Sequence, residues 1–160
     1  MIRIQAPHGK TIPTKNGTVK LIWNAGFQPK WQRRFEEVQR YIDSEVIRLD
    51  EPYVPFDEGA LIRSASIATR IGSGVVTYST PYSHYQYYGL VYGPNIPVTI
   101  GGEQTFRSPP NQIKHPTGRK LTYSKARNPL AGAFWFERMK ADHKDDILAG
   151  ARKIAGGRKA

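Results

Sequence analysis

The most regular pattern of apolar positions in the chain lies between residues 29 and 52. Apolar side chains recur there at steps of three and four residues, which places them on one stripe of an α-helix. They are Trp31, Phe35, Val38, Ile42, Val46 and Leu49. Pro29 suits the first turn of this helix and Pro52 ends it. The pattern predicts a long helix whose apolar stripe faces the core.

Alternating patterns on either side of this helix predict short strands. Residues 18–24 alternate after an Asn16-Gly17 turn and predict a strand. Residues 66–80 predict a β-hairpin, because Ile67, Thr69 and Ile71 share one face and residues 72–74 (Gly-Ser-Gly) supply the turn.

The segment between the long helix and this hairpin contains two prolines. Pro52 and Pro55 bracket Tyr53 and Val54 and predict an extended crossing. Asp57 is then placed to cap a short helix that includes Leu61.

The second half of the chain contains a long loop and a second helix. Residues 93–130 are rich in Pro and Gly and predict a basic loop with one short strand pair. Asn128 and Pro129 predict the start of a C-terminal helix that ends at Gly156-Gly157. The expected fold is α+β: a small antiparallel sheet packed against a long N-terminal helix and a C-terminal helix, with extended basic arms. We divide this single domain into an arm and strand (1–28), a core (29–92), the loop (93–130) and the C-terminal helix and tail (131–160).

Charge is distributed unevenly along the 160 residues, whose formal net charge is +11. Residues 1–29 and 105–130 contain basic side chains and no acid, whereas residues 30–51 are nearly balanced. Basic arms suit an acidic partner such as DNA or an acidic protein surface. The residues expected at such a contact are Arg107, Lys114, Arg119, Lys120, Lys125 and Arg127. The alternative is that these charges only keep the protein soluble.

Composition restricts the chemistry that the chain can perform. There is no cysteine, which excludes disulfides and thiolate chemistry and fits a reducing cytosol. We find neither a signal peptide nor an apolar run of membrane-spanning length, so we expect no membrane partner. Asp142, His143 and Asp146 occupy about one helical turn and are the one candidate metal set, but Lys140 and Lys144 favour a solvated helix face. We expect no catalytic residue, metal or cofactor.

Aromatic residues are concentrated in one segment. Six of the nine tyrosines lie within residues 78–92. A buried phenol needs a hydrogen-bond partner, so a core alone rarely accommodates so many. Trp135 lies between Phe134 and Phe136, and three successive aromatic residues cannot all face one side of a helix. One of them is therefore expected at an edge, where interface aromatics are found.

Several motifs together resemble the minor capsid or tail-completion proteins of long-tailed bacteriophages. The first motif lies after the long helix, and the second runs through the Tyr-rich segment. Residues 115–121 (HPTGRKL) give a looser match, with Leu121 in place of an aromatic residue. The matching positions are Tyr53, Val54, Pro55, Gly59, Leu61, Ser64, Tyr78, Thr80, Pro81, Tyr82, Gln86, Tyr88 and Gly89. The resemblance covers residues 30–92 well and 115–155 loosely.

The resemblance implies a non-enzymatic virion protein, made in the host bacterial cytoplasm. It would form a homo-oligomeric ring at the head-to-tail junction, around the DNA channel, between head-closure or connector proteins and tail proteins. The aromatic residues expected at the subunit interface are Tyr82, Tyr85, Tyr87, Tyr88, Tyr92 and Trp135. The alternative is that Tyr82 to Tyr88 only cover the core of one monomer.

Two other functions are compatible with the sequence. One is a nucleic-acid-binding protein that neutralises phosphates with basic arms at 105–130 and 152–160. The other is a small metal-dependent hydrolase that uses Asp142, His143 and Asp146.

Overall fold

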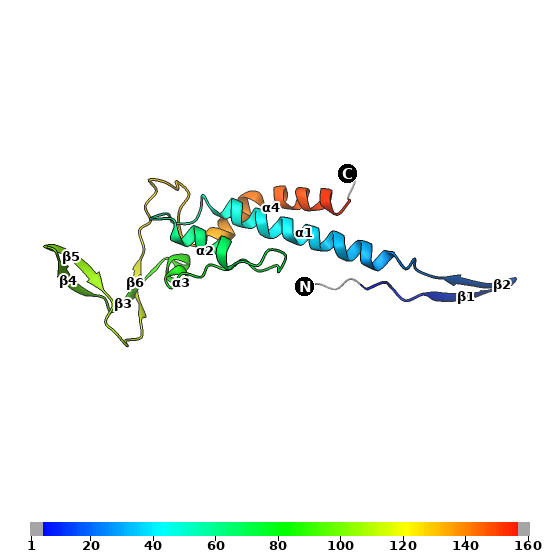
Figure 1. The fold of residues 1–160 in the computed structure, drawn as a ribbon, viewed down its shortest axis with the longest axis horizontal. Coiled ribbons are helices and arrows are strands. Elements are labelled where there is room, and N and C mark those ends of the chain that lie inside the picture. Colours follow the sequence, from blue (N-terminus) through cyan, green and yellow to red (C-terminus); the bar gives the residue numbers. More distant parts are fainter. Residues whose placement is uncertain (1–4, 157–160) are drawn as a thin grey trace. The chain divides into compact units, whose positions relative to one another are not determined.

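The computed structural model describes residues 5–156 and confirms an α+β fold (Figure 1). It contains a long helix, a C-terminal helix and small antiparallel sheets of two strands each. The chain divides into two compact units. Within the described residues, one unit comprises 5–46, 70–76 and 144–156, and the other comprises 47–69 and 77–143. The division between residues 46 and 47 falls inside the long helix, and the division between residues 143 and 144 falls inside the C-terminal helix. The two units therefore have other boundaries than the four segments expected from the sequence.

The predicted long helix is α1, Phe27–Asp50, with Pro29 in its first turn. Its burial differs from the expected pattern. The apolar stripe is only partly buried, and Phe35 is exposed. The fully buried positions of α1 are Asp43 and Asp50, seven residues apart and hence on one face of the helix.

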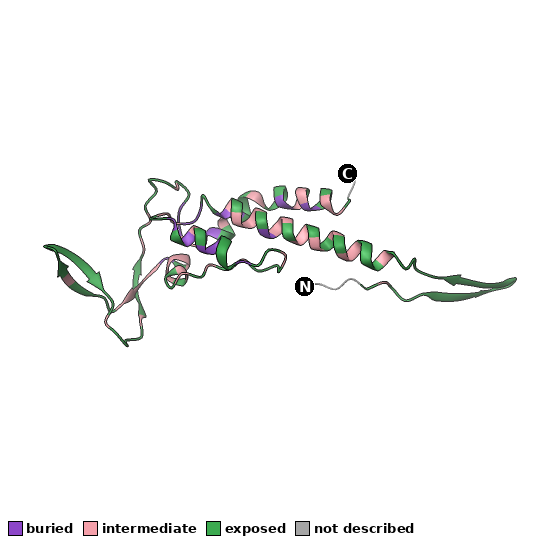
Figure 2. Cartoon of the chain, viewed as in Figure 1, coloured by how far each residue is buried: buried purple, intermediate pink, exposed green. Residues whose placement is uncertain are grey.

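The first unit contains the hairpin of β1 (Lys10–Thr14) and β2 (Gly17–Leu21), which confirms the predicted strand. Ile12 is opposite Val19, and Leu21 lies two residues further along the same face. Every residue of both strands is exposed (Figure 2). Pro13 stands within β1.

In this unit α1 contacts the C-terminal part of α4 (Trp135–Ile154) and the residue that follows it. The Arg34 guanidinium donates to the carbonyl of Ala155 at 3.3 Å. Gly150 lies directly against Tyr41, because a Cβ built on Gly150 would overlap the Tyr41 hydroxyl oxygen. The absence of a side chain at residue 150 therefore permits this approach.

The predicted hairpin at 66–80 is wrong. Residues up to Ala68 belong to α2 (Ala60–Ala68), and residues 69–80 form turns and irregular backbone. The Gly72 and Gly74 amides both donate to one carboxylate oxygen of Asp43, at 2.7 and 3.1 Å. Both glycines have positive φ, 93° and 79°. The Gly-Ser-Gly segment is thus a nest of backbone N–H groups around a carboxylate and not a hairpin turn.

The second unit contains a turn where the sequence predicted an extended crossing. The amides of Tyr53 and Val54 both donate to the carbonyl of Asp50, and the side chain of Asn128 donates to the carbonyl of Val54. The predicted cap at Asp57 is also wrong. Gly59 caps α2 with φ 75°, and no side chain completes the cap.

The buried core of this unit combines the turn, α2 and the start of α4 (Figure 2). Its fully buried apolar residues are Tyr53, Val54, Leu61, Ala65, Ala131, Trp135 and Met139. The helix predicted to start at Asn128-Pro129 begins later, at Trp135. The backbone between Asn128 and Trp135 makes hydrogen bonds outside this helix: the amide of Gly132 donates to the carbonyl of Tyr53. At the other end α4 stops at Ile154, and Gly157 lies outside the described residues.

The rest of the second unit consists of a short helix and two sheets. α3 (Ser83–Tyr88) leads into β3 (Leu90–Gly93), which pairs with β6 (His115–Lys120). Between them, β4 (Ile96–Ile100) and β5 (Glu103–Arg107) form the strand pair predicted in the long loop. Gly101 and Gly102 form its turn with positive φ, as two-residue hairpin turns require. Pro97 stands within β4.

Candidate assembly surface

The Tyr-rich segment folds as a compact turn of helix closed by a glycine. Gly89 caps α3 in the left-handed conformation, φ 69°. A Cβ at this position would lie 2.9 Å from Ala133 and 3.0 Å from the Tyr123 hydroxyl. Only glycine fits both the conformation and the space. It directs the chain into β3, where the ring of Tyr92 contacts that of Tyr85 with centroids 4.5 Å apart and planes tilted by 38°.

Trp135 belongs to the core and not to an exposed interface. It is 1% exposed and contacts the rings of Tyr78 at 5.2 Å and Tyr87 at 4.7 Å. The expectation that Trp135 lies at a subunit interface is therefore wrong for the folded chain. Of the three successive aromatics, it is Phe134 and Phe136 that remain exposed.

Tyr87 is also used mainly within its own unit. Its carbonyl accepts from the Phe134 amide at 2.9 Å, and its hydroxyl donates to the carboxylate of Glu137. Burial, followed by the hydrogen bond to Glu137, raises the pKa of Tyr87 above its usual value. Tyr87 therefore connects α3 to the start of α4.

The exposed part of the aromatic cluster is smaller than the sequence suggested. Tyr82 and Tyr88 are 41% and 46% exposed, whereas Tyr85 and Tyr92 are half-buried and in ring-to-ring contact with each other. The Tyr88 ring lies 4.7 Å from that of His84. Part of the segment covers the core, and Tyr82 and Tyr88 are left on the surface.

A buried carboxyl group lies beneath this cluster. Asp50 is 1% exposed, and its Oδ2 accepts a hydrogen bond from the Tyr78 hydroxyl at 3.1 Å. Its other carboxyl oxygen has no hydrogen-bond partner among the described residues. Burial raises the pKa of Asp50 from 3.8 to about 7; the Tyr78 hydrogen bond lowers it, and the charge of Glu137 raises it further. Asp50 is therefore half neutral near pH 7.

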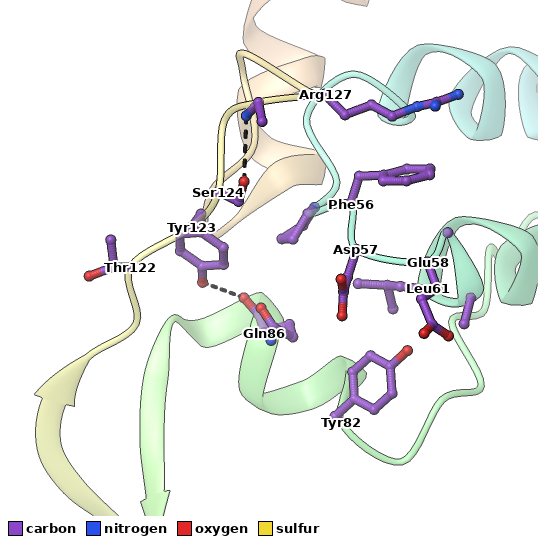
Figure 3. A pocket seen from close by; sticks show the side chains of 14 residues that line it. Phe56, Asp57, Glu58, Leu61, Tyr82, Gln86, Thr122, Tyr123, Ser124 and Arg127 are labelled. Atoms are coloured by element: carbon purple, nitrogen blue, oxygen red, sulfur yellow. Dashed lines mark hydrogen bonds between the residues drawn. The ribbon is translucent and has the colours of Figure 1, made fainter. Parts of the chain in front are cut away.

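A groove of about 510 Å³ opens beside the start of α2 (Figure 3). It is lined by residues 55–61, by Tyr82 and Gln86, and by Thr122, Tyr123, Ser124, Ala126 and Arg127. The Tyr123 hydroxyl donates to the carbonyl of Gln86 at 2.6 Å and fixes one wall. The guanidinium of Arg127 lies 4.5 Å from the centre of the Phe56 ring. We call this feature the acidic groove, because two carboxylates stand in it.

Those carboxylates belong to Asp57 and Glu58, which are both exposed. Figure 3 shows them between Phe56 and Tyr82, with Arg127 extending along Phe56. Neither makes an ion pair within the described part of the chain. From the sequence alone, the dipole of the following helix explains why two acidic residues precede it. The sequence did not predict that these two residues line a groove. The available signal was two adjacent acids beside an aromatic residue in a strongly basic chain.

The predicted basic contact residues are distributed over two sheets and a loop. Arg107 is on β5, Arg119 and Lys120 are on β6, and Lys125 lies in the loop that follows. These four side chains are exposed, as is Arg127. Lys114 is half-buried, and its ammonium donates to the side chain of Asn95 at 3.1 Å.

The candidate metal residues contact a tyrosine. The buried Tyr53 hydroxyl donates to Oδ2 of Asp142 at 2.6 Å and lies 3.3 Å from Nε2 of His143. The hydrogen bond to Asp142 raises the pKa of Tyr53. Within residues 5–156, no cluster of three or more His, Asp or Glu side chains is arranged to hold a metal ion. Asp142 and His143 thus anchor the 51–54 turn to α4.

Comparisons with protein-family models, with curated protein sequences and with solved structures found no match. None of the helices in the described residues combines the length and apolar character needed to cross a membrane.

Proposed function

We propose that the chain is a non-enzymatic structural protein of a tailed-phage virion, of the tail-completion or minor capsid type. Copies form a ring at the neck that joins head to tail around the DNA channel. The motif resemblance in residues 30–92 supports the virion assignment. The observation that carries the assembly role is the number of large apolar and aromatic side chains left exposed by the folded chain.

These exposed side chains lie on separate elements. The hairpin of β1 and β2 exposes Ile12, Val19 and Leu21, and the Tyr-rich segment exposes Tyr82 and Tyr88. Aromatic residues are enriched in the centres of protein interfaces, and apolar clusters on a surface mark contact sites. A ring needs heterologous contacts, in which one face of a subunit fits a different face of the next. Distinct exposed surfaces on one chain satisfy that requirement.

Electron microscopy and light scattering of the purified chain test the proposal. We expect closed rings and a molar mass above that of one chain at micromolar concentration. Tyr88→Ala should weaken self-association by about 30-fold, since truncating a central interface aromatic typically costs about 2 kcal/mol. Tyr88→Phe is the matched control, because it retains the ring and should retain assembly. A chain that stays monomeric at all accessible concentrations contradicts the proposal.

The exposure of Arg107, Arg119, Lys120 and Lys125 favours nucleic-acid binding as the second candidate. Replacing these four by Ser leaves Arg127 on the Phe56 ring and so leaves the acidic groove intact. The ring proposal expects unchanged molar mass in this variant. The alternative expects weaker binding to duplex DNA of any sequence, with a log–log salt slope that falls by about one for each phosphate that is no longer neutralised. Measuring mass and DNA affinity at two salt concentrations separates the two functions.

A further inference from the structure

The hairpin of β1 and β2 presents one apolar face without a partner. The register places Ile12, Val19 and Leu21 on the same face, and these side chains are 46%, 56% and 52% exposed. A two-stranded hairpin alone is marginally stable in water. Its lysines, Lys10, Lys15 and Lys20, are exposed too, and the first acidic residue of the chain is Glu36. We call residues 10–21 the basic hairpin.

The acidic groove has the complementary character. Phe56, Leu61, Tyr82 and Tyr123 supply apolar and aromatic walls, and Asp57 and Glu58 supply exposed carboxylates. The guanidinium of Arg127 extends along Phe56 (Figure 3), and that of Arg63 lies beside Gly59. Neither makes an ion pair with Asp57 or Glu58 within the described residues, so both carboxylates are accessible to a ligand. A ligand that is both apolar and cationic fits this lining.

We infer that the acidic groove receives the basic hairpin of a second copy of this chain. The inference rests on the proposed assembly function and names the partner surfaces of one subunit contact. The volume of the groove suits the two-residue turn, with Lys15, and the side chains next to it, and not a whole sheet. Lys15 lies in the turn itself, so docking of the turn brings Lys15 toward Asp57 and Glu58, whereas Lys10 lies at the open end of the hairpin.

Charge complementarity selects this occupant over other surfaces. In a chain of net charge +11, an exposed pair of adjacent carboxylates in a groove attracts the basic segments of neighbouring copies. The basic hairpin offers three lysines and no acid together with exposed apolar side chains. By contrast, the hairpin of β4 and β5 contains Glu103, which would stand near the groove carboxylates on docking.

A charge swap tests the contact directly. Lys15→Glu, and separately Glu58→Lys, should each weaken self-association of the full chain by about tenfold, because like charges then face each other. Combining both changes in one chain should restore association close to that of the wild type. Lys144→Glu, on α4, changes the net charge by the same amount as Lys15→Glu and controls for that change. All the substituted side chains are exposed, so the fold tolerates the changes.

Disulfide trapping identifies which copy supplies the hairpin. The chain has no cysteine, so Lys15→Cys and Glu58→Cys introduce unique thiols. Mixing the two single variants under a mild oxidant should give a covalent dimer. A double variant that instead closes on itself as a monomer overturns docking between copies and assigns the hairpin to its own groove.

The remaining outcomes separate this inference from the proposed function. Oligomers that form in the wild type and are unaffected by both charge reversals overturn the hairpin contact and leave the assembly function standing. A chain that is monomeric in every variant overturns both. The two reversals change the net charge in opposite directions, so a general charge effect cannot weaken association in both. Weakening by each reversal alone, followed by restoration in the combined variant, supports the contact itself.

Discussion

Asp50 couples protonation to the stability of the second unit. Its pKa is raised to about 7 in the folded chain, against 3.8 in the unfolded chain. At pH values between these two, the folded state binds more protons than the unfolded state, so stability falls as pH rises. The contribution of the neutral carboxyl is fully present below pH 3.8 and is lost as pH rises through about 7. Its full extent is about 4 kcal/mol, from a shift of roughly three pKa units.

Asp50→Asn should remove this dependence. Asn keeps the shape of the neutral acid and cannot ionise, so its free energy of unfolding should vary less between about pH 4 and pH 8. The variant should therefore gain stability relative to the wild type as pH rises. Denaturant unfolding at several pH values measures this, with Glu51→Gln as the control for loss of an exposed acid. Parallel pH profiles for wild type and Asp50→Asn would exclude Asp50 as the titrating group.

At the scale of elements, Asp43 determines the path of residues 70–76. Its Oδ2 accepts from two backbone amides of that loop, and its Oδ1 accepts from the side chain of Gln39 at 2.8 Å. Hydrogen bonds to a charged group contribute more to stability than those between neutral groups. A single side chain on α1 therefore replaces the strand pairing that the loop lacks.

Asp43→Ala should release this loop. We expect a loss of about 2–3 kcal/mol in unfolding free energy, because two backbone donors lose a charged acceptor. Hydrogen exchange at Gly72 and Gly74 should accelerate more than exchange in the rest of the unit. Asp43→Asn retains an acceptor oxygen and should lose less. Unchanged exchange at both glycines in the Ala variant would show that the nest does not hold the loop.

The elements that the sequence predicted correctly have local causes. α1 follows from apolar spacing and flanking prolines, and β2 follows from alternation after a turn. The 66–80 hairpin failed because Ile67, Thr69 and Ile71 fit an alternating pattern, while the burial of Leu61 and Ala65 at i and i+4 decides for a helix. The path of residues 70–76 depends on Asp43, which is 29 residues away from Gly72 in the sequence. A local sequence pattern cannot predict a contact between such distant residues.

The candidate site was predictable only in outline. The density of tyrosines indicates an unusual surface. Which of these tyrosines are buried and which are exposed depends on Trp135, which is distant in sequence and fills the core beneath Tyr78 and Tyr87. The acidic groove could not be foreseen for the same reason. It forms where residues 55–61 meet the 122–127 loop, and no periodicity in either segment predicts that encounter.

At the scale of the whole molecule, net charge and local charge act in opposite directions. Copies of a chain with charge +11 repel each other over distances of about a Debye length, roughly 8 Å at physiological salt. Contact between Asp57 or Glu58 and a lysine acts only at short range. Salt screens the long-range repulsion more than a partly buried contact. The assembly measurements therefore need the same ionic strength for every variant.

The prolines in the strands restrict how copies can join. Counting residue pairs back from each two-residue turn places Pro13 and Pro97 at non-hydrogen-bonded positions, where an amide would point outward from the strand edge. Proline removes that donor, so a further strand cannot add along a continuous row of hydrogen bonds.

Pro13→Val should restore the row and promote open-ended fibres, detected as a rise in light scattering during storage. Thr11→Val is the control, because it adds the same side chain to the same face without adding a donor; equal scattering by the two variants would refute this role for Pro13. Pro13 and Pro97 thus keep the outer edges of the two hairpins from acting as templates for open-ended growth.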